Sequence, residues 1–188
     1  MRIISGVSKG RRLLTPRKPS IRPTSDRVKE SIFNILGREV QDKVVLDLFA
    51  GTGNLGIEAL SRGAKRALFV EKDRQAVRLI KKNLLQCGME ERSKILSTDV
   101  NRAIAILSQQ GESFDLILMD PPYEKGLIEK TLFKLTSKRI YQEDSILMIE
   151  HDRREPLPHT IANWSLVRQR RIGDTVISFL KPHLSTKE

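Results

Sequence analysis

The chain has 188 residues, a formal net charge of +11 and one cysteine, Cys87. This length suits a single domain with a substantial core, and one cysteine excludes an internal disulfide and fits a reducing, cytoplasmic compartment. No run approaches 18 apolar residues, no apolar segment follows the basic N-terminus, and the three histidines lack metal-ligand spacing, so we expect no membrane span, signal peptide or metal.

The N-terminal part of the chain reads as an extension followed by one helix. Residues 2–14 predict a basic β-hairpin with a turn near residues 8–10, and residues 16–23 form a proline-rich connector. Ser25 then precedes a helix that stops at Gly37. The apolar side of this helix consists of Val28, Ile32, Ile35 and Leu36.

Strands and helices alternate from residue 43 onward. We predict strands near 43–49, 66–71, 93–97, 114–120 and 145–150, separated by helices near 54–62, 73–87, 99–110 and 126–137. Two more strands, 164–172 and 175–180, flank a turn at Gly173–Asp174. This alternation predicts an α/β fold with a doubly wound, mostly parallel seven-stranded sheet. The chain is then one domain, with residues 1–23 as the extension, 24–182 as the core and 183–188 as a tail.

A glycine-rich turn follows the first predicted strand. Gly51, Gly53 and Gly56 formally match the dinucleotide fingerprint, so a NAD site has to be considered. Asp47, four residues earlier, would repel a pyrophosphate, whereas it would favour a ligand that carries an ammonium and a sulfonium. Glu71, at the end of the second predicted strand, can hold two ribose hydroxyls in either cofactor. Asp47, together with the loop Asp120-Pro121-Pro122-Tyr123, favours S-adenosylmethionine over NAD.

The motif Asp120-Pro121-Pro122-Tyr123 ends the apolar run 114–119. Prolines lack N–H groups and fix φ, so the chain must leave the sheet as a stiff, extended loop. A carboxylate, unpaired carbonyls and an aromatic ring then lie together at the carboxyl end of a strand, where open α/β sheets bind ligands. These groups suit a flat base with an exocyclic amino group: the carboxylate and a carbonyl accept its N–H groups, and the ring stacks on its face.

The positive charge is concentrated in the first part of the chain. Residues 1–40 hold 10 Lys/Arg against 3 Asp/Glu, residues 41–150 hold 17 against 16, and residues 151–188 hold 7 against 4. Many basic faces are only solvated, but a segregated charge beside a candidate base-binding loop favours a nucleic-acid contact. The candidate RNA-binding residues are Lys9, Arg11, Arg12 and Arg22.

Taken together, these segments resemble the bacterial 16S ribosomal RNA guanine-N2 methyltransferases, which modify a hairpin loop of the small subunit. The glycine loop and the Asp-Pro-Pro-aromatic motif are generic to amino-directed methyltransferases, whereas residues 22–34 are much more specific. The resemblance covers nearly the whole chain and is carried by residues 2–6, 9–13, 22–34, 47–53, 55–63, 120–123 and 173–175.

The resemblance implies a Rossmann-like class I methyltransferase that uses S-adenosylmethionine and acts on 16S RNA within a small subunit already carrying ribosomal proteins. We expect the protein itself to be a monomer. In such a site Asp47, Phe49, Gly51 and Gly53 would cradle the methionine and ribose, and Glu71 would hold the ribose hydroxyls. Asp99 would accept from the adenine amino group, although it reads equally well as a helix N-cap. The catalytic residues would be Asp120, Pro121, Pro122 and Tyr123.

Three alternatives remain open from the sequence. Asp-Pro-Pro-Tyr serves adenine amino groups equally well, so a DNA or RNA adenine-N6 methyltransferase is the nearest one. A NAD-dependent oxidoreductase is disfavoured by Asp47. A non-catalytic RNA-binding module with a structural Rossmann-like core would bind no cofactor.

Overall fold

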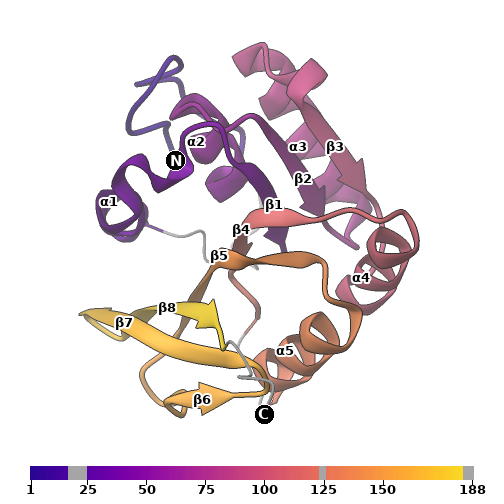
Figure 1. Cartoon of the computed structure of the whole chain (residues 1–188). Coiled ribbons are helices and arrows are strands. Elements are labelled where there is room, and N and C mark those ends of the chain that lie inside the picture. The colour runs from indigo at the N-terminus through magenta and orange to yellow at the C-terminus, as the bar shows by residue number, and fades with distance from the viewer. Residues whose placement is uncertain (17–24, 123–125, 184–188) are drawn as a thin grey trace.

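The computed structural model describes residues 1–16, 25–122 and 126–183 (Figure 1). Its helices are α1 (Asp26–Leu36), α2 (Asn54–Ser61), α3 (Arg74–Cys87), α4 (Val100–Gln109) and α5 (Leu127–Lys138), with short 3-10 helices at Gly37–Val40 and Glu90–Arg92. Its strands are β1 (Val44–Leu48), β2 (Arg66–Val70), β3 (Ser93–Leu96), β4 (Phe114–Met119), β5 (Tyr141–Asp152), β6 (Thr160–Ile161), β7 (Trp164–Ile172) and β8 (Thr175–Pro182). Among these residues no helix is long and apolar enough to cross a membrane.

The strands form one sheet in the order β3-β2-β1-β4-β5-β8-β7-β6. β1 pairs in parallel with β2 on one side and with β4 on the other, so the direction of winding reverses between β1 and β4. β8 adds antiparallel to β5, and β7 adds antiparallel to β8. The carboxyl ends of β1, β2, β4 and β5 therefore meet at one edge of the sheet.

The predicted doubly wound, mostly parallel sheet is confirmed, with one strand more than the seven expected. The additional strand, β6, pairs with β7. It has only two residues and is therefore too short to leave a periodic signal in the sequence. β5 is also longer than predicted, because it runs from Tyr141 to Asp152 along both β4 and β8. The predicted N-terminal hairpin is reduced to one bridge between Arg2 and Arg12 around a turn.

Two apolar clusters cover the two faces of the sheet. Side chains of successive strand residues point to opposite faces, and in β4 Leu116 and Leu118 join one cluster while Ile117 and Met119 join the other. The first cluster includes residues of α1, α2 and α3, and the second includes residues of α4 and α5. By the same alternation of side chains, the face covered by the first cluster is also the face of Asp47, Asp120 and Glu150.

The first helix begins and ends where its sequence predicts. The Ser25 hydroxyl accepts a hydrogen bond from the Val28 N–H at 3.2 Å, which satisfies a donor of the first turn. Gly37 follows the last helical residue with φ +53°, a conformation that glycine adopts without a steric penalty. Val28, Ile32, Phe33 and Leu36 are buried, so α1 is held to the domain by its apolar side.

Candidate active site

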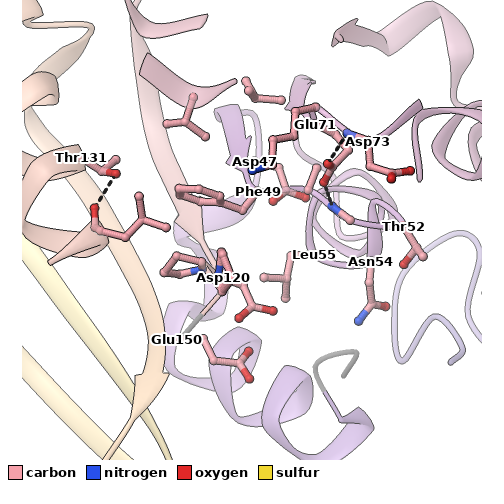
Figure 2. A pocket seen from close by; sticks show the side chains of 18 of the residues that line it. Asp47, Phe49, Thr52, Asn54, Leu55, Glu71, Asp73, Asp120, Thr131 and Glu150 are labelled. Atoms are coloured by element: carbon pink, nitrogen blue, oxygen red, sulfur yellow. Dashed lines mark hydrogen bonds between the residues drawn. The ribbon is translucent and has the colours of Figure 1, made fainter. Parts of the chain in front are cut away.

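A cavity of about 660 Å³ lies at the edge of the sheet where the winding reverses. It is lined by residues that follow the carboxyl ends of β1, β2, β3 and β4, by part of β5, and by residues of α1, α5 and β8. Figure 2 shows side chains that line this cavity from several elements, among them Asp47 of β1, Glu71 after β2, and Glu150 of β5. Open α/β sheets bind ligands at this place because the loops after adjacent strands diverge there.

The loop after β1 forms one wall of the cavity. Phe49 has φ +61°, which is uncommon for a residue with a side chain, and it lines the cavity together with Gly51. Gly51 has φ +55°, and its N–H donates to a Glu71 carboxylate oxygen at 2.8 Å. Gly53 is not among the lining residues: it caps the start of α2 with φ +79°. Its predicted place in the cofactor cradle is therefore an indirect one, through the shape of the loop.

Gly56 brings α2 close to the sheet. A Cβ at this position would lie 2.3 Å from Phe69 Cε1 and 3.0 Å from an Asp47 oxygen. The Gly56 N–H donates to that same Asp47 oxygen at 2.9 Å. The third glycine of the fingerprint therefore allows close helix–sheet packing and supplies a hydrogen bond to the buried carboxyl.

Asp47 is a buried carboxyl group that faces other carboxylates. It is 2 % exposed. Burial raises the pKa of Asp47 to about 8; the Gly56 N–H opposes this, and the charges of Asp120 and Glu71 add to it. A cation next to Asp47 would reverse this shift, because an opposite charge favours the ionised form. The site is therefore built to gain electrostatic energy from a positively charged ligand.

Glu71 directly follows β2, Asp99 lies between β3 and α4, and both line the cavity. One Glu71 oxygen accepts from Gly51, and the other accepts from the Asp73 N–H at 2.8 Å. Asp99 caps α4 by accepting from the Arg102 N–H at 3.0 Å. Both carboxylates are thus fixed by backbone donors while they remain at the cavity surface.

The Asp120-Pro121-Pro122 segment lines the part of the cavity next to α5. Tyr123 lies outside the described residues. Sequence reasoning missed Glu150, Thr131 and Thr175, which also line the cavity here. Glu150 carried one usable signal, because it is a carboxylate at the end of the predicted strand 145–150; that this strand pairs with the one leading to Asp120 is seen only in the structure.

The cavity is acidic although the whole chain is strongly basic. Among its described lining residues, only Lys72 has a cationic side chain. The carboxyl groups of the lining are those of Asp47, Glu71, Asp73, Asp99, Asp120 and Glu150. Such a wall attracts a cationic ligand and repels a pyrophosphate.

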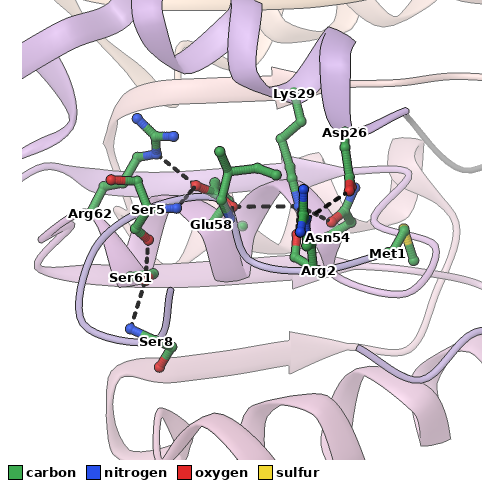
Figure 3. Close-up of polar contacts among 12 residues, drawn as sticks. Met1, Arg2, Ser5, Ser8, Asp26, Lys29, Asn54, Glu58, Ser61 and Arg62 are labelled. Carbon is green, nitrogen blue, oxygen red and sulfur yellow. Dashed lines mark hydrogen bonds and ion pairs between the residues drawn. The ribbon is translucent and has the colours of Figure 1, made fainter. Parts of the chain in front are cut away.

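The N-terminal segment is fastened to α1 and α2 by a buried polar network (Figure 3). Glu58 accepts from the backbone N–H groups of Ile4 and Ser5 at 2.8 and 3.0 Å. The fully buried Lys29 ammonium lies 3.4 Å from a Glu58 oxygen and also donates to Asn54 and to the Arg2 carbonyl. Burial lowers the pKa of Lys29, and the Glu58 carboxylate opposes that shift. Removal of one partner of such a pair typically costs about 3–5 kcal/mol.

This anchoring leaves the basic side chains of the segment outside. Lys9, Arg11 and Arg12 are exposed, and Arg22 lies outside the described residues. Gly6 allows the segment to approach α2, because a Cβ there would lie 1.8 Å from the Ser61 carbonyl oxygen. The same carbonyl accepts from the Val7 N–H at 2.9 Å. The loop that carries the three cationic side chains is therefore held in a fixed place.

The chain resembles known proteins over most of its length. The family model described as conserved hypothetical protein 95 matches residues 1–181. The chain belongs to this family. A Bacillus subtilis relative named putative rRNA methyltransferase YlbH is 38 % identical over 181 residues, which cover 96 % of this chain and 98 % of the relative. The Escherichia coli K12 protein named ribosomal RNA small subunit methyltransferase D is 37 % identical over 175 residues, which cover 92 % and 85 %.

Solved structures also resemble this chain over most of its length. The structure of the putative methyltransferase yhhF from Escherichia coli matches with a TM-score of 0.85 and 32 % identity, over 98 % of this chain and 99 % of that one. An RNA methyltransferase from Salinibacter ruber, solved in complex with S-adenosyl-L-homocysteine, matches with a TM-score of 0.69 and 15 % identity, a likeness of fold alone. The sheet is the Rossmann-like class I methyltransferase fold.

Proposed function

We propose that this protein transfers a methyl group from S-adenosylmethionine to the exocyclic N2 of a guanine in 16S ribosomal RNA of the small subunit. The observation that carries the proposal is the joining of two sites in one cavity. Asp47, Glu71, Asp120 and Pro121 all line the same acidic cavity, and we assign the first two to the cofactor and the last two to the base. The names of the relatives, which are rRNA and small-subunit rRNA methyltransferases, support RNA of the ribosome as the substrate.

The acidic wall is the reason for choosing S-adenosylmethionine over NAD. When bound, this cofactor supplies an electrophilic methyl group on a positively charged sulfur. Asp47 favours the positive charge of the methionine end, and Glu71 offers acceptors to the ribose hydroxyls at the end of β2. The pyrophosphate of NAD would meet the same carboxylates with the wrong sign of charge.

The residues of the chain act on the nucleophile by positioning it. The lone pair of a guanine amino nitrogen is delocalised into the ring, which makes it a weak nucleophile. Asp120 and the Pro121 carbonyl accept its two N–H bonds, favour a pyramidal nitrogen and stabilise the positive charge that develops on it. Tyr123 stacks on the base, which contributes about 1–3 kcal/mol.

The exposed N-terminal cations are the proposed contacts to RNA phosphates. Lys9, Arg11 and Arg12 lie on the loop that Glu58 fixes to the domain, and Arg22 follows on the connector. Phosphate contacts position an RNA without specifying its sequence. The substrate is the small subunit with ribosomal proteins in place, in the cytoplasm, and the enzyme acts as a monomer.

The test of the reaction uses small subunits from a strain that lacks this protein. Incubation with the purified protein and S-adenosylmethionine should give N2-methylguanosine at one position of 16S RNA, read by nuclease digestion and mass spectrometry. Asp120→Ala should abolish the product while S-adenosylhomocysteine binds within a few-fold of the wild type. Asp144→Ala, an exposed carboxylate change at the start of β5, is the control. N6-methyladenosine as the product would favour the adenine alternative, and a protein without cofactor binding would be a non-catalytic module.

The RNA contacts are tested through the salt dependence of binding. Neutralisation of Lys9, Arg11 and Arg12 together should weaken RNA binding and flatten the slope of log K against log[salt] by about 2–3 units. Cofactor affinity and the modified nucleotide should not change. An unchanged slope in the triple variant would mean that these cations are only solvated surface.

A further inference from the structure

Glu150 lines the cavity beside the proposed base-binding residue Asp120, and the proposed methyl transfer assigns it no role. It lies on β5 and is 5 % exposed, yet it lines the cavity. Met119 of β4 is in register with Ile149 of β5, so the next residues along the two strands, Asp120 and Glu150, lie level with each other. Figure 2 shows both carboxylates pointing into the same part of the cavity.

Two adjacent carboxylates suit one edge of guanine and oppose the corresponding edge of adenine. Guanine presents the N1–H and the N2 amino group side by side, which are consecutive donors. Adenine presents its N6 amino group beside N1, which is an acceptor with a lone pair. Since an ionised carboxylate only accepts hydrogen bonds, Asp120 alone can serve either amino group, but a second carboxylate beside it rewards guanine and repels adenine N1.

Burial makes this arrangement selective. A buried acceptor that forms a hydrogen bond with an N–H of the correct base disfavours an analogue that lacks this N–H. The reason is that the protein acceptor loses this hydrogen bond when the analogue binds. Thr175 at the start of β8 and Leu127 at the start of α5 line the same cavity, so protein groups from further elements flank the space beside Glu150.

We infer that Glu150 is the specificity-determining residue that accepts the guanine N1–H and selects guanine over adenine at this site. The inference rests on the proposed guanine-N2 methylation and adds the group that chooses the base. Asp120 and the Pro121 carbonyl hold the amino nitrogen, and Glu150 reads the neighbouring ring nitrogen.

The test combines a substrate analogue with a variant. Small subunits are reconstituted with 16S RNA that carries either guanine or 2-aminopurine at the methylated position; 2-aminopurine keeps the amino group but has no N1–H. The wild type should use 2-aminopurine about 10- to 100-fold less well, measured as kcat/KM. In Glu150→Gln the guanine rate should fall and the ratio between the two bases should approach one. Guanine also carries an oxygen at C6 that 2-aminopurine lacks. This difference is the same for the wild type and for Glu150→Gln, so it cancels when their guanine to 2-aminopurine ratios are compared.

A matched control and a second measurement make the result decisive. Glu143→Gln changes the same side chain at the opposite end of β5, where it is 73 % exposed, and should keep the wild-type ratio. Inosine, which has the N1–H but no amino group, placed at the target position should make the subunit a better competitive inhibitor of the wild type than adenosine does. This measurement needs no folded variant.

The outcomes separate the two levels of the proposal. Equal use of guanine and 2-aminopurine by the wild type, or an unchanged ratio in Glu150→Gln, would overturn the role of Glu150 while guanine-N2 methylation stands. Absence of N2-methylguanosine from every wild-type reaction would overturn the proposed function and the assignment of Glu150 with it.

Discussion

Asp47→Asn should stabilise the cofactor-free protein at neutral and alkaline pH while it weakens cofactor binding. The substitution replaces an ionisable carboxyl group, 2 % exposed and facing Asp120 and Glu71, by a side chain that cannot ionise. The asparagine oxygen can still accept from the Gly56 N–H, which now lies 2.9 Å from an Asp47 oxygen. The variant therefore separates the electrostatic role of Asp47 from its role in holding α2.

The magnitude follows from the pKa of Asp47 in the two states. It is 3.8 in the unfolded chain and about 8 in the folded protein. Because folding raises this pKa, the stability that the protonated carboxyl provides is complete below pH 3.8 and is lost as the pH rises to about 8. Each pH unit above 3.8 lowers the free energy of unfolding by about 1.4 kcal/mol, so the loss at pH 7 is at most about 4 kcal/mol. The buried asparagine NH₂ needs its own partner, which offsets part of the gain, so we expect about 1–3 kcal/mol.

Thermal unfolding at several pH values measures this effect. A gain of about 1–3 kcal/mol corresponds to about 2–12 °C in Tm for a chain of this size. The variant and the wild type should unfold at similar temperatures near pH 4, and their difference should grow to a plateau above about pH 8. S-adenosylmethionine should raise the Tm of the variant less than that of the wild type, with a Kd weakened about 10-fold.

A control of the same chemistry should change stability in the opposite direction. Asp115→Asn on β4 removes a carboxylate that accepts from the Val44 N–H at 2.7 Å and lies 4.0 Å from Lys43. It should lower the Tm slightly and leave cofactor binding unchanged. An Asp47→Asn variant that is no more stable than the wild type at about pH 8.5, or that binds S-adenosylmethionine with full affinity, would contradict the electrostatic role of Asp47.

Three more substitutions test the walls of the cavity. Glu71→Ala should weaken S-adenosylhomocysteine about 10- to 100-fold in calorimetry, because the ribose loses its acceptors and Gly51 loses the carboxylate that holds it; full affinity would remove Glu71 from the site. Gly56→Ala should lower the free energy of unfolding by about 1–3 kcal/mol in urea, because the new Cβ would meet the Phe69 ring at 2.3 Å; an unchanged midpoint would contradict this close packing. Asp99→Ala should cost about 1 kcal/mol as a lost N-cap of α4 and also weaken the cofactor, whereas Asp99→Ser should restore stability alone.

The alternation of strands and helices could be read from the chain because each element buries a continuous apolar face. The predicted helix near 73–87 is α3 (Arg74–Cys87), and the predicted strand near 114–120 is β4 (Phe114–Met119). Helix ends were equally legible, since Asp99 and Gly88 carry local capping chemistry that acts within a few residues. β6 could not be predicted because two residues have no periodicity.

The order of the elements, the acidic residues at the strand ends and the Asp-Pro-Pro turn could be predicted from the chain, because they depend on local periodicity, caps and backbone restriction. Which of those groups share one cavity could be seen only in the folded structure. Strand order and register bring Asp120 level with Glu150 across β4 and β5, and the packing of α2 buries Asp47 against Gly56. Asp120 and Glu150 are 30 residues apart in the sequence, and their juxtaposition depends on the order of the strands in the sheet, which no local pattern encodes.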